Sequence, residues 1–180
     1  MDWSLLIIER LSRMWLDDRM TDAVLVLATV TVGLTAGVMF CYQIAIMPGL
    51  HELGDRDFIR AYQRLDQKIV NPLFVGVSFL GGGALLVVAT ALQEAGTSRF
   101  TLLGVATVVY VGAVLLLTMA FHVPRNNELA RVPVDHASDD DLARARARFE
   151  GPWNRLHIVR TLASIASLAL VAAALLDSTP

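Results

Sequence analysis

The segment PWNRLHIVRT, residues 152–161, contains the residues whose types and spacing most favour chemistry. Trp153, His157 and Arg160 are spaced i, i+4, i+7, so a helix places all three on one face. A buried imidazole beside Arg160 stays neutral, and a neutral imidazole can act as a general base near neutral pH. Arg160 can in turn hold an enolate or phenolate oxygen. The alternative interpretation is that both side chains reach the membrane surface and anchor the end of a helix.

Further polar residues lie close to the ends of long apolar segments, where ionisable groups are candidates for function. Asp66 is a second candidate for the base, so the predicted catalytic residues are His157, Arg160 and Asp66. Residues of suitable type to bind or orient a substrate are Asn126, Asn127, Asn154, Trp153, His122 and His51. A metal held by helices normally has His or Glu pairs at i, i+3 or i, i+4 spacing, which His51, His122 and His157 lack. We therefore predict no metal at these histidines, although the sequence leaves a metal or haem there open.

The elements that position these residues are predicted to be membrane-spanning helices. Of the 180 residues, 55% are hydrophobic and 18% are charged, against roughly 45–50% and about 25% in an ordinary soluble domain. Residues 23–50, 69–93 and 100–121 contain no Asp, Glu, Lys, Arg or His, and such long apolar segments indicate membrane spans. This composition excludes a soluble globular enzyme, a disordered chain and a disulfide-built secreted module. The net charge of -2 gives no indication of nucleic-acid binding.

We predict an all-α fold: a single integral membrane domain, residues 1–180, built as a bundle of four transmembrane helices. The predicted spans are residues 22–47, 71–92, 100–122 and 156–176. Residues 3–16 are predicted to form an N-terminal interfacial amphipathic helix. The alternative is an extension of the first span that is interrupted near Asp17, Asp18 and Arg19. Residues 51–68 have the apolar spacing of a second amphipathic helix.

Prolines and polar runs predict where the spans end. Pro48-Gly49 and Pro124 are expected to end the first and third spans. A long polar loop is expected over residues 124–152, within which Ser138 and the three aspartates after it begin a short helix.

The distribution of basic residues predicts the orientation of the protein in the membrane. Residues 48–70 and 123–156 carry ten Lys and Arg, whereas the N-terminal segment and residues 93–99 carry four. The positive-inside rule then places the two larger loops in the cytoplasm and both termini outside, in the plasma membrane of a bacterium. The expected partners are the lipid bilayer and a hydrophobic small molecule, not nucleic acid. The sequence leaves a homo-oligomer open.

Four segments follow one another in the order GLTAGVMFCYQIAIMPGL, AYQRLDQKIVNPLF, FHVPRNNELA and PWNRLHIVRTLASIASLAL. Together they resemble the anthrone oxygenase-like membrane proteins, a family also called DUF1772, over about residues 25–176. The resemblance implies a four-helix membrane protein. Members act in fungal polyketide pathways, where they oxidise an anthrone to an anthraquinone with O2 and without a metal or organic cofactor. The motif positions in this sequence are Pro124, Asn126, Asn127, Leu129, Trp153, His157 and Arg160.

The chemistry that the resemblance implies needs a base, a donor that stabilises an anion, and a dry pocket. On that resemblance we expect His157 or Asp66 to be the base, Arg160 the donor, and Asn126 or Asn154 an orienting group. The predicted function is a membrane-embedded oxidoreductase. It acts with O2 on a hydrophobic aromatic or quinone-like substrate by proton abstraction.

Other functions fit the same residues. In a non-enzymatic membrane protein, such as an assembly partner or small-ligand binder, Asn126 and Asn127 cap helix ends and Arg160 bonds loop carbonyls. A transporter is disfavoured because no predicted span carries a charged residue near its centre. For a hydrophobic substrate, Gly81–Gly83 are expected to leave room between helices for access from the bilayer.

Overall fold

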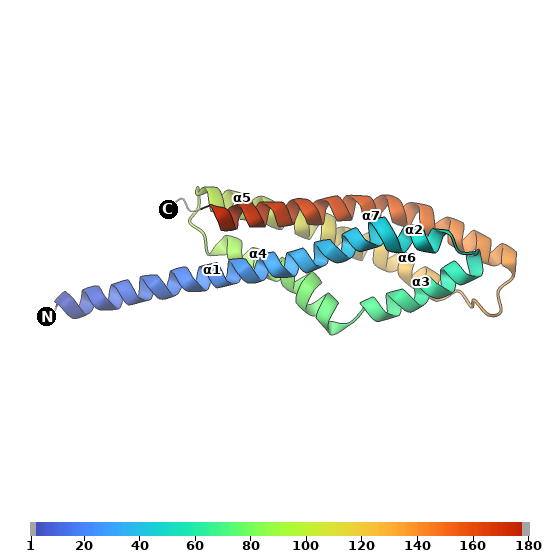
Figure 1. The fold of residues 1–180 in the computed structure, drawn as a ribbon, viewed down its shortest axis with the longest axis horizontal. Coiled ribbons are helices and arrows are strands. Elements are labelled where there is room, and N and C mark those ends of the chain that lie inside the picture. Colours follow the sequence, from blue (N-terminus) through green and yellow to red (C-terminus); the bar gives the residue numbers. More distant parts are fainter. Residues whose placement is uncertain (1–2, 178–180) are drawn as a thin grey trace.

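The chain forms a bundle of long helices (Figure 1). The computed structural model describes the backbone of residues 3–177 and the side chains of residues 19–177. It is 87% helical and has no strand in the part of the chain that it describes. Four helices are long and apolar enough to cross a membrane: Arg19–His51, Pro72–Ala91, Ser98–Ala130 and Asp139–Leu176. The predicted all-α fold with four such helices is confirmed.

Three of these four helices combine α-helical and π-helical segments, the latter labelled η. The elements in chain order are α1 (Trp3–Cys41), η1 (Tyr42–Ile46), α2 (Met47–His51), α3 (Asp55–Ile69), η2 (Pro72–Leu80), α4 (Gly81–Ala91), α5 (Ser98–Val109), η3 (Tyr110–Leu116), η4 (Thr118–His122), α6 (Val123–Ala130) and α7 (Asp139–Leu176). A π-helix is rare and occurs mostly as a single wide turn, often at a functional site. The presence of π-helical segments in three spans therefore marks these positions as candidates for a functional site.

The N-terminal segment is helical, as predicted, and is continuous with the first span. Helix α1 runs from Trp3 to Cys41 without a break. Its N-terminal end projects beyond the rest of the bundle (Figure 1). The sequence left an extension of the first span as the alternative, and the expected interruption of that extension near Asp17, Asp18 and Arg19 is wrong.

The predicted ends of the first and third spans are wrong. The helix continues through Pro48 to His51 and through Pro124 to Ala130. A proline within a helix lacks a donor, and its ring clashes with the carbonyl four residues earlier. In both helices a π-helical segment directly precedes the helix that contains the proline. Its wider turn moves the backbone out of the register in which the proline ring clashes.

The predicted polar loop of residues 124–152 is also mostly helical. Only residues 131–138 connect α6 to α7, and Ser138 accepts a hydrogen bond from the Asp141 amide as the N-cap of α7. Helix α7 then passes through Pro152. Its first turns hold because Leu142, Ala145 and Phe149 are buried, so the segment has an apolar face to pack.

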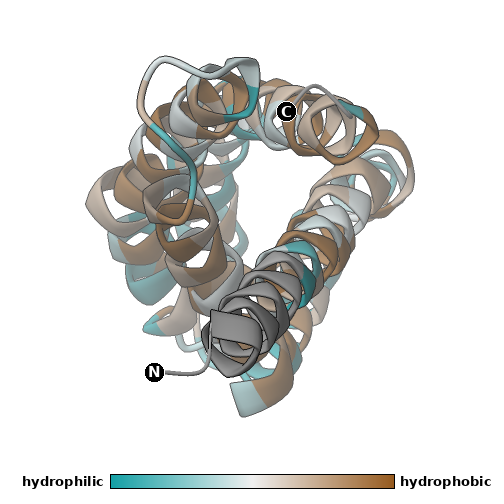
Figure 2. Ribbon diagram, turned by 90° about the vertical axis from the view of Figure 1, so that its left-hand side faces the viewer, coloured by the Kyte–Doolittle hydropathy of each residue, from teal (hydrophilic) through white to brown (hydrophobic). Residues whose placement is uncertain are grey.

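The membrane-spanning part of the bundle has an apolar core and an apolar outer surface. Helices α1, α4, α5 and α7 pack together, with Leu25, Leu86 and Leu103 fully buried between them. Large hydrophobic side chains such as Val108 and Leu162 are exposed on the outside. Hydrophobic residues accordingly occur along the lengths of the helices in the end-on view (Figure 2). A surface of this kind suits contact with lipid.

The glycines of α4 do not leave the opening that we expected. A Cβ atom on Gly83 would lie 2.8 Å from the Leu115 side chain, and one on Gly82 would lie 3.2 Å from the Tyr110 hydroxyl. Tyr110 is buried and donates a hydrogen bond to the Phe79 carbonyl at 3.0 Å. These glycines therefore permit close helix packing instead of access from the bilayer.

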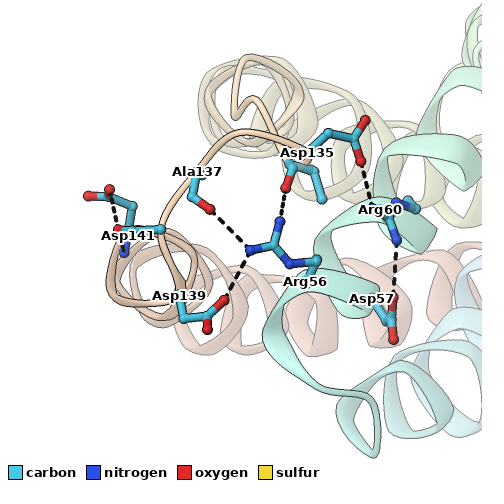
Figure 3. Close-up of polar contacts among 9 residues, drawn as sticks. Arg56, Asp57, Arg60, Asp135, Ala137, Asp139 and Asp141 are labelled. Carbon is cyan, nitrogen blue, oxygen red and sulfur yellow. Dashed lines mark hydrogen bonds and ion pairs between the residues drawn. The ribbon is translucent and has the colours of Figure 1, made fainter.

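A polar cap, made of α3, residues 131–138 and residues 139–150 of α7, covers one end of the bundle. Helix α3 is amphipathic, as predicted, and buries Phe58, Ile59 and Tyr62 against α7 and α6. Arginines on its other face bind the connecting segment (Figure 3): Arg60 donates to Asp135 at 2.7 Å, and Arg56 donates to the carbonyls of Val134 and Ala137 and to Asp139. The cap thus joins parts of the chain about 75 to 83 residues apart.

Candidate functional site

A cavity of about 330 Å³ lies where the membrane-spanning bundle meets the polar cap. This volume falls within the range of roughly 300–1,000 Å³ that is common for small-molecule sites. Its walls combine apolar and polar side chains: Val38, Met39, Tyr42, Tyr62, Asp66, Ile69, Val70, Phe74, Val75, Phe79, Thr118, Met119, Val123, Asn126, Asn127, Trp153 and Arg160. Three of the four π-helical segments, η1, η2 and η4, contribute to the lining. The irregular turns therefore gather around the cavity.

Arg160 is a buried cation in the cavity wall. Its side chain donates to Nδ1 of His157 at 2.8 Å and to the Thr118 hydroxyl at 3.1 Å. Its Nε atom has no hydrogen-bond partner, and none of the ion pairs among the described residues includes it. The guanidinium carbon lies 5.6 Å from the centre of the Trp153 ring. A buried arginine that bonds only neutral groups attracts an anionic ligand atom.

His157 binds Arg160 from a position outside the cavity lining. Its Nε2 lies 3.0 Å from the Met39 carbonyl, which can only accept, so Nε2 carries the proton. Its Nδ1 then accepts from Arg160, and both ring nitrogens are occupied. The ring stacks on Trp153 with centroids 4.6 Å apart, is fully buried, and does not line the cavity. His157 is thus a neutral group that fixes the position of Arg160.

Asn126 connects several polar side chains of the cavity wall. Its Oδ1 accepts hydrogen bonds from the Tyr62 hydroxyl at 3.1 Å and from Trp153 Nε1 at 3.0 Å. These two donors fix the orientation of the amide, so its Nδ2 donates to Asp66 at 2.7 Å. One wall of the cavity therefore has an ordered carboxyl group whose partner is itself held by two rings.

Burial changes the acidity of the groups that α3 brings to this wall. Desolvation raises the pKa of Asp66 above its usual value, and the hydrogen bond from Asn126 opposes part of that rise. Burial also raises the pKa of Tyr62 well above its usual value. A carboxyl group with a raised pKa is a better proton acceptor when ionised. Asp66 therefore has the environment of a general base.

The structure brings five of the nine predicted site residues to the cavity wall: Asp66, Asn126, Asn127, Trp153 and Arg160. Of the others, His51 is exposed and pairs with Glu150 at 2.6 Å, outside the cavity. His122 is buried with its ring 5.2 Å from that of Trp153, and neither of its nitrogens has a partner among the described residues. Asn154 and His157 lie on the same helix as Arg160 but outside the lining.

Residues that sequence reasoning missed complete the wall. Tyr62 lies four residues before Asp66, so the helical spacing of α3 contained a signal for it. Tyr42 and Thr118 lie within long apolar segments, where their contacts with α7 are not visible in the spacing. The Tyr42 ring lies 6.3 Å from that of Trp153, and Thr118 accepts from Arg160.

A second cavity of about 360 Å³ lies between α6 and α7, lined by Arg125, Glu128, Leu129, Val132, Ala145, Arg148 and Phe149. Its charged groups lie near the surface of the polar cap, and none is a predicted site residue. Among the residues that the structure describes, no group of three or more His, Cys, Asp or Glu side chains is arranged to hold a metal ion. The first cavity is therefore the candidate site.

Comparison with known proteins gives one match. Residues 58–170, more than half of the chain, match the family described as anthrone oxygenase. The matched range includes eight of the nine predicted site residues, from Asp66 to Arg160. No curated protein and no solved structure matches the chain significantly.

Proposed function

The chain belongs to the anthrone oxygenase family, and from this premise we propose that it is a membrane-embedded oxidoreductase. The proposed substrate is a hydrophobic anthrone-like molecule, which O2 oxidises to the corresponding quinone. The observation that carries this proposal is that two groups of opposite charge line the same cavity. Asp66 and Arg160 both line the cavity but are not bonded to each other.

Two such groups suit a substrate that loses a proton at one atom and carries the resulting negative charge at another. An anthrone has an acidic CH2 group between two aryl rings, in conjugation with a ketone. The Asp66 carboxylate takes one CH2 proton, and the negative charge moves to the ketone oxygen, which Arg160 stabilises. Asn126 keeps Asp66 oriented, while apolar residues of η2 and η4 exclude water from the anion.

The anion then reacts with O2, the oxidant. It gives one electron to O2, and the radical pair combines so that a C–O bond forms and a peroxide anion results. Protonated Asp66 returns its proton to the peroxide. Loss of the second CH2 proton and cleavage of the O–O bond leave a carbonyl group and water. In sum, one CH2 group and one O2 give one C=O group and one H2O.

The test is oxygen uptake by the purified protein in detergent with anthrone as substrate, corrected for the reaction without protein. We expect Asp66→Asn to lower kcat by about 100- to 10,000-fold, the usual contribution of general base catalysis. The matched control is Arg155→Gln, an exposed position on α7 outside the cavity. Wild-type turnover in the Asp66→Asn variant, or none above background in the wild type, contradicts the proposal.

We also propose the orientation that the basic residues predict, with the polar cap in the cytoplasm and both termini outside. The support is the concentration of arginines in the cap, where Arg56, Arg60 and Arg146 all bind other cap residues or the adjoining residues 51–55. A reporter fused after residue 180 tests it. Activity of a cytoplasmic reporter at that position reverses the orientation.

A further inference from the structure

The candidate cavity has a mouth that can be located from its exposed lining. Most of its lining residues are buried or half-buried, whereas Val70, Met119 and Asn127 are exposed. Val70 immediately precedes the second span, and the other two residues lie on η4 and α6 at the end of the third span. The mouth therefore lies between the start of η2 and the η4–α6 segment.

The η2 and η4 sides of this mouth share no hydrogen bond among the described residues, whereas α3 and α6 are joined by the bond from Asn126 to Asp66. Helix η2 packs on α1 and α4, and no hydrogen bond between described residues connects it to η4 or α6. In Figure 1 the bend between α3 and η2 points away from the other helices. A ligand can thus pass between η2 and η4 without breaking a polar contact.

The polar cap, in contrast, closes the end of the cavity that faces it. Gln63 donates to the carbonyls of Leu129 and Val132 at 2.8 and 3.1 Å, which holds α3 against the end of α6. Arg56 and Arg60 bind the connecting segment farther out (Figure 3). A route through the cap breaks several of these contacts together, so access from that side is disfavoured.

The mouth itself has a polar and an apolar edge. Asn127 lies on α6, toward the polar cap, whereas Met119 lies eight residues earlier in η4, and its side chain is 58% exposed. Val70, on the facing side, is 66% exposed. Met119 lies within a membrane-spanning helix, where an exposed apolar side chain faces lipid, and Val70 lies two residues before the second span.

We propose that the ligand reaches the cavity sideways from the lipid leaflet next to the polar cap, past Met119 and Val70. The ligand class is an amphiphile with a planar apolar body and at least one polar oxygen. The body lies among the side chains of η2 and η4, and the oxygen points toward Arg160 in the cavity wall. This inference rests on the proposed function only in the choice of a planar aromatic ligand.

The test measures how alizarin, a coloured dihydroxyanthraquinone that partitions into membranes, binds to the protein in lipid vesicles. Stopped-flow absorbance gives its association and dissociation rates, and no turnover is needed. An obstacle on the route slows both rates equally and leaves the Kd unchanged, whereas a side chain that fills the site raises the Kd. We expect Met119→Trp and Val70→Trp to slow both rates at least tenfold.

Two comparison variants locate the route. Leu116→Trp adds the same bulk at an exposed position of η3 outside the cavity, and it is expected to bind alizarin at wild-type rates. Asn127→Trp, at the polar edge, is expected to slow binding less than Met119→Trp does. A larger effect of Asn127→Trp, unchanged rates in both apolar-edge variants, or no binding to the wild type overturns the inference. Alizarin binding with the expected rates but no anthrone turnover overturns the proposed function alone.

Discussion

Two arginines of α7, Arg146 and Arg160, are both largely buried but have opposite surroundings. Arg146 donates to Glu150 and Asp55 and to the carbonyls of His51 and Leu53. Among the described residues, Arg160 has only neutral partners, and one of its nitrogens is unpaired. Two carboxylates balance the positive charge of Arg146, and its hydrogen bonds hold parts of the polar cap together. Arg160 is held in place, but no carboxylate among the described residues balances its charge. A site for an anionic ligand atom requires such a cation.

The largest expected effect is a separation of function between these two positions. Arg160→Gln is expected to lower kcat for anthrone by about 100- to 1,000-fold, the usual effect of removing an oxyanion donor, with little loss of folded protein. Arg146→Gln is expected to lower the free energy of unfolding by roughly 1.5–3 kcal/mol, because Glu150 and Asp55 lose their charged hydrogen-bond donor. Oxygen uptake and thermal unfolding in detergent measure the two effects. Equal loss of stability in both variants contradicts the comparison.

The next prediction concerns how Arg160 is held. His157→Leu removes both the acceptor for Arg160 and the donor to Met39, and it is expected to lower kcat by up to about 100-fold through misplacement of the guanidinium group. His157→Gln keeps one acceptor and one donor, so it is expected to recover most of that loss. If His157 is instead the base, the glutamine variant is as inactive as the leucine variant.

A smaller effect is expected in the pH profile. Activity requires ionised Asp66, so kcat/KM rises with pH through the pKa of this group. Asn126→Ala removes the hydrogen bond that lowers the pKa of Asp66. Its pKa then rises further, and the acid limb of the profile moves to higher pH. A shift to lower pH, or none, contradicts the role of Asp66 as base.

The smallest effect is expected at the outer edge of the polar cap. Arg60 pairs with Asp57 and Asp135, whose side chains are 68% and 76% exposed. Exposed ion pairs of this kind contribute about 1 kcal/mol or less. Arg60→Ala is therefore expected to change the thermal midpoint only slightly and to leave kcat as in the wild type. A large loss of stability would mean that the whole cap, and not only Arg146, depends on tight charge pairing.

Sequence periodicity was sufficient for contacts within one helix. The spacing of residues 51–68 predicted an amphipathic helix, and α3 buries Phe58, Ile59 and Tyr62 on one face. The spacing of Trp153, His157 and Arg160 likewise predicted their shared face, and the three side chains are in contact. Such residues are neighbours through local geometry alone.

Sequence periodicity could not predict contacts between helices or departures from regular helix geometry. Asn126 and Asp66 meet across 60 residues, and nothing in their local spacing pairs them. Pro48 and Pro124 carry the usual signal for a helix end, but the π-helical turns before them arise from packing of the whole bundle. The role of Gly83 likewise depends on Leu115, a residue of another span.

The central claim is that Arg160 stabilises a negative oxygen in the cavity, and the ionisation of bound alizarin tests it most directly. Alizarin changes colour when its phenol group loses a proton, so its absorbance reports its charge in the site. In the wild type we expect bound alizarin to ionise at a lower pH than alizarin in detergent alone, and in Arg160→Gln we expect this shift to disappear. The same ionisation curve for both proteins would contradict the claim.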